Sequence, residues 1–288
     1  MDLKAMAMGL AFALMWSSAF TSARIIVTET SPLAASALRF LLAGLVAVAI
    51  ARAQGQSWRL TRAQACGTVI FGLCQNALYL GLNFVAMQWV QASVASIIAS
   101  TMPLMVAFLG WAVFHDRVRP LGLAGLVAGV IGVAIIMGAR LSGGVDPVGM
   151  ALCFAAALAL SVATLTVRGA SGGGNVMMIV GLQMFVGAAV LSIVSAATED
   201  WSAVQMSPRL IGAFAYTVLI PGVLATWVWF KLVGRIGAVK AATFHFLNPF
   251  FGVAIAAAVL GERLGALDLL GVAVIAGGIL AVQLSKQA

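Results

Sequence analysis

Three polar residues spaced four apart lie inside a long apolar stretch of this sequence. Gln75, Tyr79 and Asn83 fall on one face of a helix, because side chains at i, i+4 and i+8 stack along one stripe. Two amides and a phenol can hold a polar ligand through hydrogen bonds without a fixed charge. Hydrogen bonding between neighbouring helices is the alternative use of such a stripe. We favour a stripe that lines a cavity.

Other polar and aromatic residues recur within apolar segments. With the three above, we expect the binding site to include Trp16, Ser17, Ser96, Ser100, Trp227, His245 and Asn248. Serine side chains within membrane helices can instead bond to their own backbone, and a mid-span tryptophan can instead face lipid. Pro103 and Pro249 each follow one of these polar runs, and a proline inside a helix frees a carbonyl group and kinks the helix. We predict that the two prolines form a pair of hinges, with easier packing as the alternative.

Arg39 is the basic residue that the sequence places inside an apolar segment, about two helical turns from its start. A cation within a membrane faces protein or water rather than lipid. We expect a structural role for Arg39, bonding helix carbonyl groups or hydroxyl groups, with a role in binding or gating as the alternative. No apolar segment carries an acidic residue near its centre, which disfavours strong coupling to protons or sodium ions.

The motifs of catalysis and metal binding are missing from the sequence. It contains no His-Glu-x-x-His, no nucleophile elbow and no P-loop. Its three cysteines, Cys66, Cys74 and Cys153, lack the spacing of metal ligands. We therefore expect no enzyme activity, no metal and no cofactor.

The composition places these residues in a membrane protein. Of 288 residues, 63% are hydrophobic and 8% are charged, and the mean hydropathy is +1.11. A soluble surface cannot accommodate such a composition, and the apolar runs lack the alternation of a membrane β-barrel. The sequence predicts an all-α polytopic membrane protein with ten transmembrane helices, at about 5–23, 32–51, 63–87, 91–114, 120–139, 147–167, 176–197, 208–232, 238–260 and 265–284.

An internal repeat divides the chain in two. A shift of 146 positions carries Ala92, Ala95, Pro103, Asp116, Arg117, Gly125 and Gly132 onto Ala238, Ala241, Pro249, Glu262, Arg263, Gly271 and Gly278. We predict two five-helix repeats, residues 1–142 and 143–288. An odd number of helices inverts the second repeat, which creates a pseudo-two-fold axis in the membrane plane and a site near the midplane. Inverted repeats favour a transporter. Small residues in the last helix of each repeat predict close packing within a repeat or a homodimer seam.

The distribution of basic residues predicts the orientation of the helices. If the N-terminus is cytoplasmic, the cytoplasmic side carries Lys4, Arg52, Arg59, Arg62, Arg117, Arg119, Arg168, Lys231, Arg235, Lys240 and Lys286, against Arg24, Arg140, Arg209 and Arg263 on the other side. This excess follows the positive-inside rule and predicts that both termini are cytoplasmic. The net charge of +8 therefore indicates membrane orientation and not a nucleic-acid partner.

The chain resembles the drug/metabolite transporter superfamily, and specifically its ten-helix EamA branch. The residues that carry the resemblance are Trp16-Ser17-Ser18-Ala19-Phe20, Pro32, Arg39 and the repeated block of Pro103, Asp116, Arg117 and Gly125 with Pro249, Glu262, Arg263 and Gly271. Asp116 stands where the family often has Glu.

The resemblance implies inverted five-helix repeats that move small metabolites by alternating access. The chain looks most like the exporters of aromatic and neutral amino acids. The resemblance implies an inner-membrane exporter of amino acids or related metabolites in the lipid bilayer. The absence of acidic residues near span centres predicts a uniporter, and we expect a monomer or weak homodimer. The alternative is a carrier for drugs or other metabolites that is coupled to protons, with His245 as the proton-handling residue.

Overall fold

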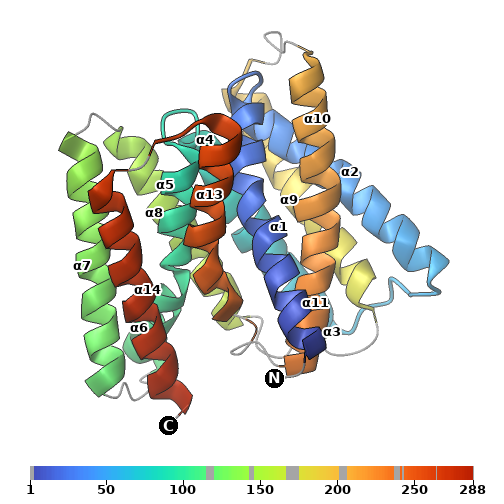
Figure 1. Cartoon of the computed structure of the whole chain (residues 1–288). Helices are drawn as coiled ribbons and strands as arrows, with labels where there is room; N and C mark the ends of the chain where they lie inside the picture. Colours follow the sequence, from blue (N-terminus) through green and yellow to red (C-terminus); the bar gives the residue numbers. More distant parts are fainter. Residues whose placement is uncertain are drawn as a thin grey trace.

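The computed structural model describes residues 3–114, 120–142, 146–166, 175–200, 206–236, 241, 243–263 and 265–287. All regular secondary structure in this part of the chain is helical. The helices form one bundle with α7 and α14 at one side and α2 at the other, and both termini lie at the same end (Figure 1). Several residues on which the sequence predictions draw lie outside the described residues, namely Asp116, Arg117, Arg119, Arg168, Ala238 and Lys240.

The helices follow the predicted segments closely. The first half contains α1 (Leu3–Val27), α2 (Pro32–Ala53), α3 (Arg62–Phe71), η1 (Gly72–Leu80), α4 (Gly81–Ala86), α5 (Ala92–Ser100), α6 (Met102–Phe114) and α7 (Pro120–Ser142). The second half contains α8 (Pro147–Thr166), α9 (Val176–Thr198), α10 (Pro208–Thr217), η2 (Val218–Leu224), α11 (Ala225–Ile236), η3 (Thr243–Leu247), α13 (Asn248–Leu260) and α14 (Ala266–Gln287). Local sequence explains several starts: prolines open α2 and α10, and Thr61 with Gln64 forms a capping box at α3.

The prediction of an all-helical, multi-pass membrane protein is confirmed. Among the described residues, six helical segments are long and apolar enough to cross a bilayer: Leu3–Val27, Pro32–Ala53, Arg62–Ala86, Pro147–Thr164, Val176–Thr198 and Pro208–Ile236. Shorter apolar helices at Ala92–Val106, Pro120–Ile136, Asn248–Leu260 and Ala266–Ala281 occupy the positions of the other predicted spans. The total of ten spans and the cytoplasmic termini stay predictions.

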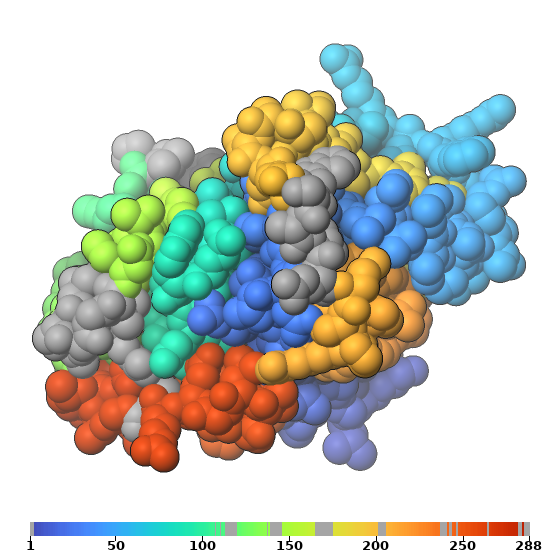
Figure 2. Space-filling view, turned by 90° about the horizontal axis from the view of Figure 1, so that it is seen from above, coloured from blue at the N-terminus to red at the C-terminus, as the bar shows by residue number. Residues whose placement is uncertain are grey.

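The two halves pack through helices of corresponding predicted spans, although α5 is the first part of span 91–114 and α13 the last part of span 238–260. Helix α2 packs against α9, α5 against α13, and α7 against α14. Seen from the end opposite the termini, segments of both halves interleave across the molecule and do not form separate lobes (Figure 2). A two-fold axis that relates the halves would bring corresponding spans together in this way.

Glycines form the contact between α7 and α14. A Cβ atom added at Gly278 would lie 2.6 Å from the carbonyl oxygen of Gly125, and one added at Gly132 would lie 2.9 Å from that of Gly271. The prediction that these small residues pack within a repeat or form a homodimer seam is therefore corrected, because the seam joins the two repeats of one chain. Only glycine lets the two backbones approach so closely.

Each of the two prolines is the second residue of a helix. Helix α5 ends at Ser100, Thr101 caps it, and Pro103 is the second residue of α6. Pro249 is the second residue of α13, after the short 3-10 helix η3. Each proline therefore follows an interruption of its predicted span, and in the first turn of a helix it gives up no hydrogen bond within that helix. That the prolines kink their spans stays a prediction. That the breaks serve as hinges stays a prediction.

Carboxylates of the second half cap helices of the first half, at the end of the bundle opposite the termini. Glu262 accepts from the backbone N–H groups of Ala92 and Ser93 at 2.9 and 3.0 Å, and Glu199 accepts from those of Leu33 and Ala34 at 2.8 Å each. A helix leaves its first N–H groups unpaired and carries partial positive charge at that end. The two glutamates satisfy both demands and connect the halves.

The glycine seam predicts opposite effects for two adjacent substitutions. Gly278→Ala should lower the stability of the purified protein by about 1–3 kcal/mol, because its methyl group has no room against α7. Gly277→Ala is the matched control: a Cβ atom there meets nothing within 4 Å, so stability should stay equal or rise by up to about 1 kcal/mol. Thermal unfolding in detergent measures both, and equal melting temperatures for the two variants would contradict the seam.

Candidate functional site

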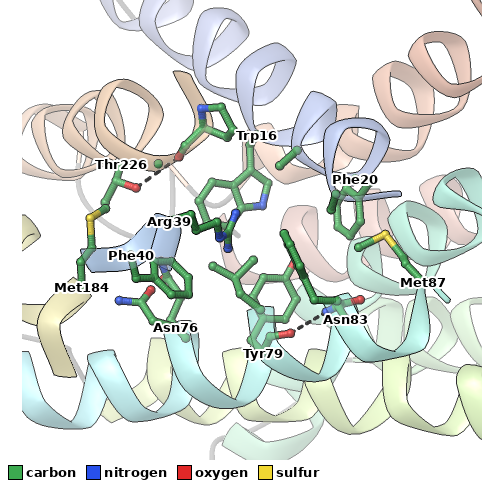
Figure 3. A pocket seen from close by; sticks show the side chains of 17 residues that line it. Trp16, Phe20, Arg39, Phe40, Asn76, Tyr79, Asn83, Met87, Met184 and Thr226 are labelled. Carbon is green, nitrogen blue, oxygen red and sulfur yellow. Dashed lines mark hydrogen bonds between the residues drawn. The ribbon is translucent and has the colours of Figure 1, made fainter. Parts of the chain in front are cut away.

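A closed pocket lies between α1, α2, the segment from η1 to α4, α9, η2 and α11. Its lining contains Trp16, Ala19, Phe20, Ala23, Arg39, Phe40, Gln75, Asn76, Tyr79, Leu80, Asn83, Phe84, Met87, Met184, Pro221, Gly222 and Thr226 (Figure 3). The cavity volume is about 30 Å³, which is room for about one water molecule. At this volume the pocket has no space for a larger solute.

Two π-helical segments shape the pocket. The segment η1 begins at Gly72 and η2 begins at Val218, so they hold corresponding places in the two halves, 146 positions apart. Both supply pocket residues: η1 gives Gln75, Asn76 and Tyr79, and η2 gives Pro221 and Gly222. π-helical turns are rare and occur often at functional sites. Neither π-helical segment was predicted from the sequence. The second contains one signal, Pro221, which cannot donate a backbone hydrogen bond.

Four of the predicted site residues line the pocket: Trp16, Gln75, Tyr79 and Asn83. The rings of Trp16 and Tyr79 are parallel, with an interplanar angle of 2° and centroids 6.5 Å apart. The Asn83 side-chain nitrogen donates to the carbonyl oxygen of Tyr79 at 2.8 Å, whereas its oxygen, Oδ1, has no partner among the described residues. The polar stripe therefore faces the pocket, with one hydrogen-bond acceptor left free.

Four more predicted residues form a hydrogen-bonded cluster beside the pocket, not in its wall. Ser17 Oγ donates to Asn248 Oδ1 at 3.2 Å, and Ser96 Oγ donates to the Asn248 carbonyl oxygen at 2.9 Å. Asn248 Nδ2 lies 3.0 Å from His245 Nδ1. Since Ser17 is in α1, Ser96 in α5 and Asn248 in α13, the cluster ties helices of both halves together.

Aromatic rings surround His245 and connect this cluster to the pocket. The His245 ring centroid lies 5.1 Å from that of Phe12, 5.0 Å from that of Trp229 and 6.1 Å from that of Trp16. Trp16 therefore contributes to both places, with one side toward the pocket and the other toward the histidine.

Ser100 and Trp227 were predicted as site residues, and the structure places them elsewhere. Ser100 Oγ donates to the Ile97 carbonyl oxygen at 2.6 Å, so its hydroxyl group is used within its own helix. Trp227 packs against two hydrophobic clusters without lining the pocket, and Trp229 is the tryptophan of α11 that approaches His245. The choice between the two tryptophans depends on the rotation of α11, which packing determines.

Arg39 lines the pocket without the bonds expected of a structural residue. It is 3% exposed, and its Nε and Nη2 atoms have no hydrogen-bond partner among the described residues. Its guanidinium carbon lies 4.3 Å from the Phe40 ring centroid and 4.5 Å from that of Phe84. Figure 3 places the side chain at the centre of the site, next to Trp16. None of the lining residues is acidic.

A larger, polar cavity lies toward the end of the bundle opposite the termini. Its volume is about 620 Å³, and its lining includes Val27, Glu29, Leu33, Gln88 and Glu199. It is about one helical turn beyond the closed pocket, because α1 contributes Ala23 to the pocket and Val27 to the cavity. A short layer of protein therefore separates the pocket from a wide opening. Among the described residues, no group of three or more His, Cys, Asp or Glu side chains could hold a metal ion.

The model of the EamA-like transporter family matches the chain twice, at residues 3–138 and 147–284. The chain belongs to the EamA-like transporter family. This confirms the resemblance seen in the sequence. An EamA-family chain is a membrane transporter of small molecules, so the expectation that the protein is not an enzyme also holds.

Several relatives of this EamA chain are themselves named as transporters. It is 25% identical to the "Uncharacterized transporter YvbV" of Bacillus subtilis over 96% of this chain and 90% of that one. It is 27% identical to the "Uncharacterized inner membrane transporter YedA" of Escherichia coli, again over 96% and 90%. A "Probable amino-acid metabolite efflux pump" of Salmonella typhimurium is 26% identical over 92% of this chain and 89% of its own length. One solved crystal structure, 19% identical, matches the fold with a TM-score of 0.70 over 100% of this chain and 99% of that one.

The cluster around Asn248 predicts a loss of stability when its amide is removed. Asn248→Ala should cost about 1–3 kcal/mol, because Ser17 and His245 would lose their buried partner. Ser100→Ala is the control, since its hydroxyl group bonds only to its own helix, and it should change stability by less than about 0.5 kcal/mol. Thermal unfolding of the two purified variants measures the difference. An Asn248→Ala protein as stable as the wild type would rule out the cluster as a link between the halves.

Proposed function

We propose that this EamA transporter is an inner-membrane exporter of aromatic and neutral amino acids or related small metabolites. The observation that carries the proposal is the closed pocket of stacked aromatic rings and amides, bordered by both halves of the chain. Its lining combines the parallel pair of Trp16 and Tyr79 with polar groups from η1. An amino acid has the same two parts, an apolar side chain and a charged polar end. The name of the Salmonella relative supports the same substrate class.

The proposed mechanism is alternating access between two inverted five-helix repeats, residues 1–142 and 143–288. The pairing of α2 with α9, α5 with α13 and α7 with α14 supports such a relation. Tilting of the halves would open the pocket first to one side and then to the other, and the helix breaks before Pro103 and Pro249 would serve as hinges. The excess of Lys and Arg on one side supports cytoplasmic termini.

We propose uniport, with proton-coupled efflux of drugs or other metabolites as the alternative. No acidic side chain lines the pocket. An amide nitrogen can only donate, so Asn248 Nδ2 requires His245 Nδ1 to be a hydrogen-bond acceptor, as in the neutral ring. Three aromatic rings surround that imidazole. This setting supports a histidine that stays neutral and holds helices together.

Transport into inside-out vesicles, which corresponds to export from the cell, tests the exporter and its coupling. Uptake of radiolabelled phenylalanine, tryptophan and methionine into such vesicles should proceed at the same rate with and without a pH gradient. Acceleration by a gradient would support the proton-coupled alternative. Transport of a lipophilic cation but of none of the three amino acids would refute amino-acid export.

Two tryptophan variants test the pocket itself. Trp16→Ala should reduce amino-acid efflux at least about tenfold, because it removes one ring of the stacked pair from the pocket wall. Trp111→Ala is the matched control, since Trp111 is 52% exposed on α6 and does not line the closed pocket. Its efflux should equal that of the wild type. Equal rates for both variants, at equal protein levels, would contradict the assignment of the pocket as the transport site.

A further inference from the structure

The closed pocket contains a cation, Arg39, that has no counterion among the described residues. Arg39 is almost fully buried, two of its nitrogens have no partner in this part of the chain, and the pocket lining contains no carboxylate. Taking a guanidinium group out of water without pairing it is costly, and proteins keep such groups where they act on a ligand. The two flanking phenylalanine rings attract the cation but accept no N–H hydrogen bond in its plane.

The two free nitrogens lie on the same edge of the guanidinium group. The N–H bonds of Nε and Nη2 point the same way, and this pair forms the side-on fork that holds both oxygens of a carboxylate. The unused edge of Arg39 is therefore shaped for a planar anion with two oxygens.

The pocket also contains a hydrogen-bond acceptor, Asn83 Oδ1, in addition to the donors of Arg39. Asn83 lines the same pocket. Its side-chain nitrogen donates to the Tyr79 carbonyl oxygen, and its Oδ1 has no hydrogen-bond partner among the described residues. Asn83 is also next in sequence to Phe84, whose ring lies 4.5 Å from the Arg39 guanidinium carbon. The same pocket thus offers donors for an anion and an acceptor for a cation.

We propose that Arg39 binds the carboxylate of the transported solute and that Asn83 Oδ1 accepts from its ammonium group. This inference rests on the proposed function. It specifies the substrate class as α-amino acids, whose carboxylate and ammonium groups bind to different residues. The side chain of the solute would lie against Trp16 and Tyr79. Because the pocket has room for only about one water molecule, binding takes place when the halves part and the pocket widens.

Gln183 provides a matched comparison for Arg39. It is the eighth residue of α9, as Arg39 is the eighth residue of α2, and its side-chain nitrogen and oxygen also lack partners among the described residues. Gln183 is fully buried but does not line the pocket. A purely structural role would predict similar consequences for the two residues, whereas a ligand-binding role affects Arg39 alone.

The experiment measures binding to the purified protein in lipid nanodiscs by thermal shift and calorimetry. The twenty common L-amino acids are screened first. The tightest binder is then compared with its carboxamide, with the amine that lacks its carboxylate, and with the acid that lacks its amine. The carboxamide and the amine should bind at least about tenfold more weakly than the amino acid. Arg39→Met should weaken binding of the amino acid and of the deaminated acid to the same extent, whereas Gln183→Met should leave both unchanged.

Two further variants separate the charged ends. Arg39→Lys keeps the charge but not the fork, so it should restore part of the lost affinity. Asn83→Leu should weaken the amino acid but not the deaminated acid. Without ligand, Arg39→Met should melt at or above the wild-type temperature, because it removes an unpaired buried charge.

Several outcomes would overturn the assignment: no amino acid binds, the carboxamide binds as tightly as its acid, or Arg39→Met binds as tightly as the wild type. Efflux assays keep this result distinct from the proposed function. Binding through Arg39 without efflux of the same amino acid would refute the proposal of an exporter and support the binding site. Efflux that persists in Arg39→Met would support the exporter and refute the binding site.

Discussion

The shortage of hydrogen-bonding partners inside a bilayer is the constraint on which this structure depends. Lipid offers neither donors nor acceptors, so each polar group of a membrane helix must be paired within the protein. The chain meets this demand with glutamates at helix starts, with hydroxyl groups turned back to their own helices, and with the network around Asn248. Six of the described residues still have a buried side-chain N or O atom without a partner: Thr21, Ser36, Arg39, Asn83, Ser93 and Gln183. Of these, Arg39 and Asn83 are the two that line the small pocket.

Close packing and local widening of helices work together to make that pocket. Glycines bring α7 and α14 into backbone contact and hold the halves together at one side of the bundle. The π-helical segments η1 and η2 do the opposite at the centre, since each inserts extra backbone where the pocket lies. Gly72 lets η1 lie against α9, where an added Cβ atom would be 2.7 Å from the Gln183 carbonyl oxygen.

The sequence predicted the helices well because hydropathy and proline positions determine them: α2, expected at 32–51, runs from Pro32 to Ala53. It also predicted that Gln75, Tyr79 and Asn83 share one face. It did not reveal the π-helical segments, since contacts between helices decide whether a backbone N–H bonds four or five residues back. For the same reason it selected Trp227 and passed over Trp229. The sequence identified Arg39 as unusual, but only the structure showed that two of its nitrogens lack the expected partners.

Both halves place a π-helical segment at the pocket, but the side chains that they supply to its wall differ. The wall that η1 and α2 supply carries an arginine, amides and a phenol, whereas η2 and α9 supply Pro221, Gly222 and Met184. If the halves exchange roles during the cycle, the form open to one side and the form open to the other therefore differ in free energy. The empty carrier would rest with a preference for one of them, and its affinity for solute would differ between the two faces of the membrane.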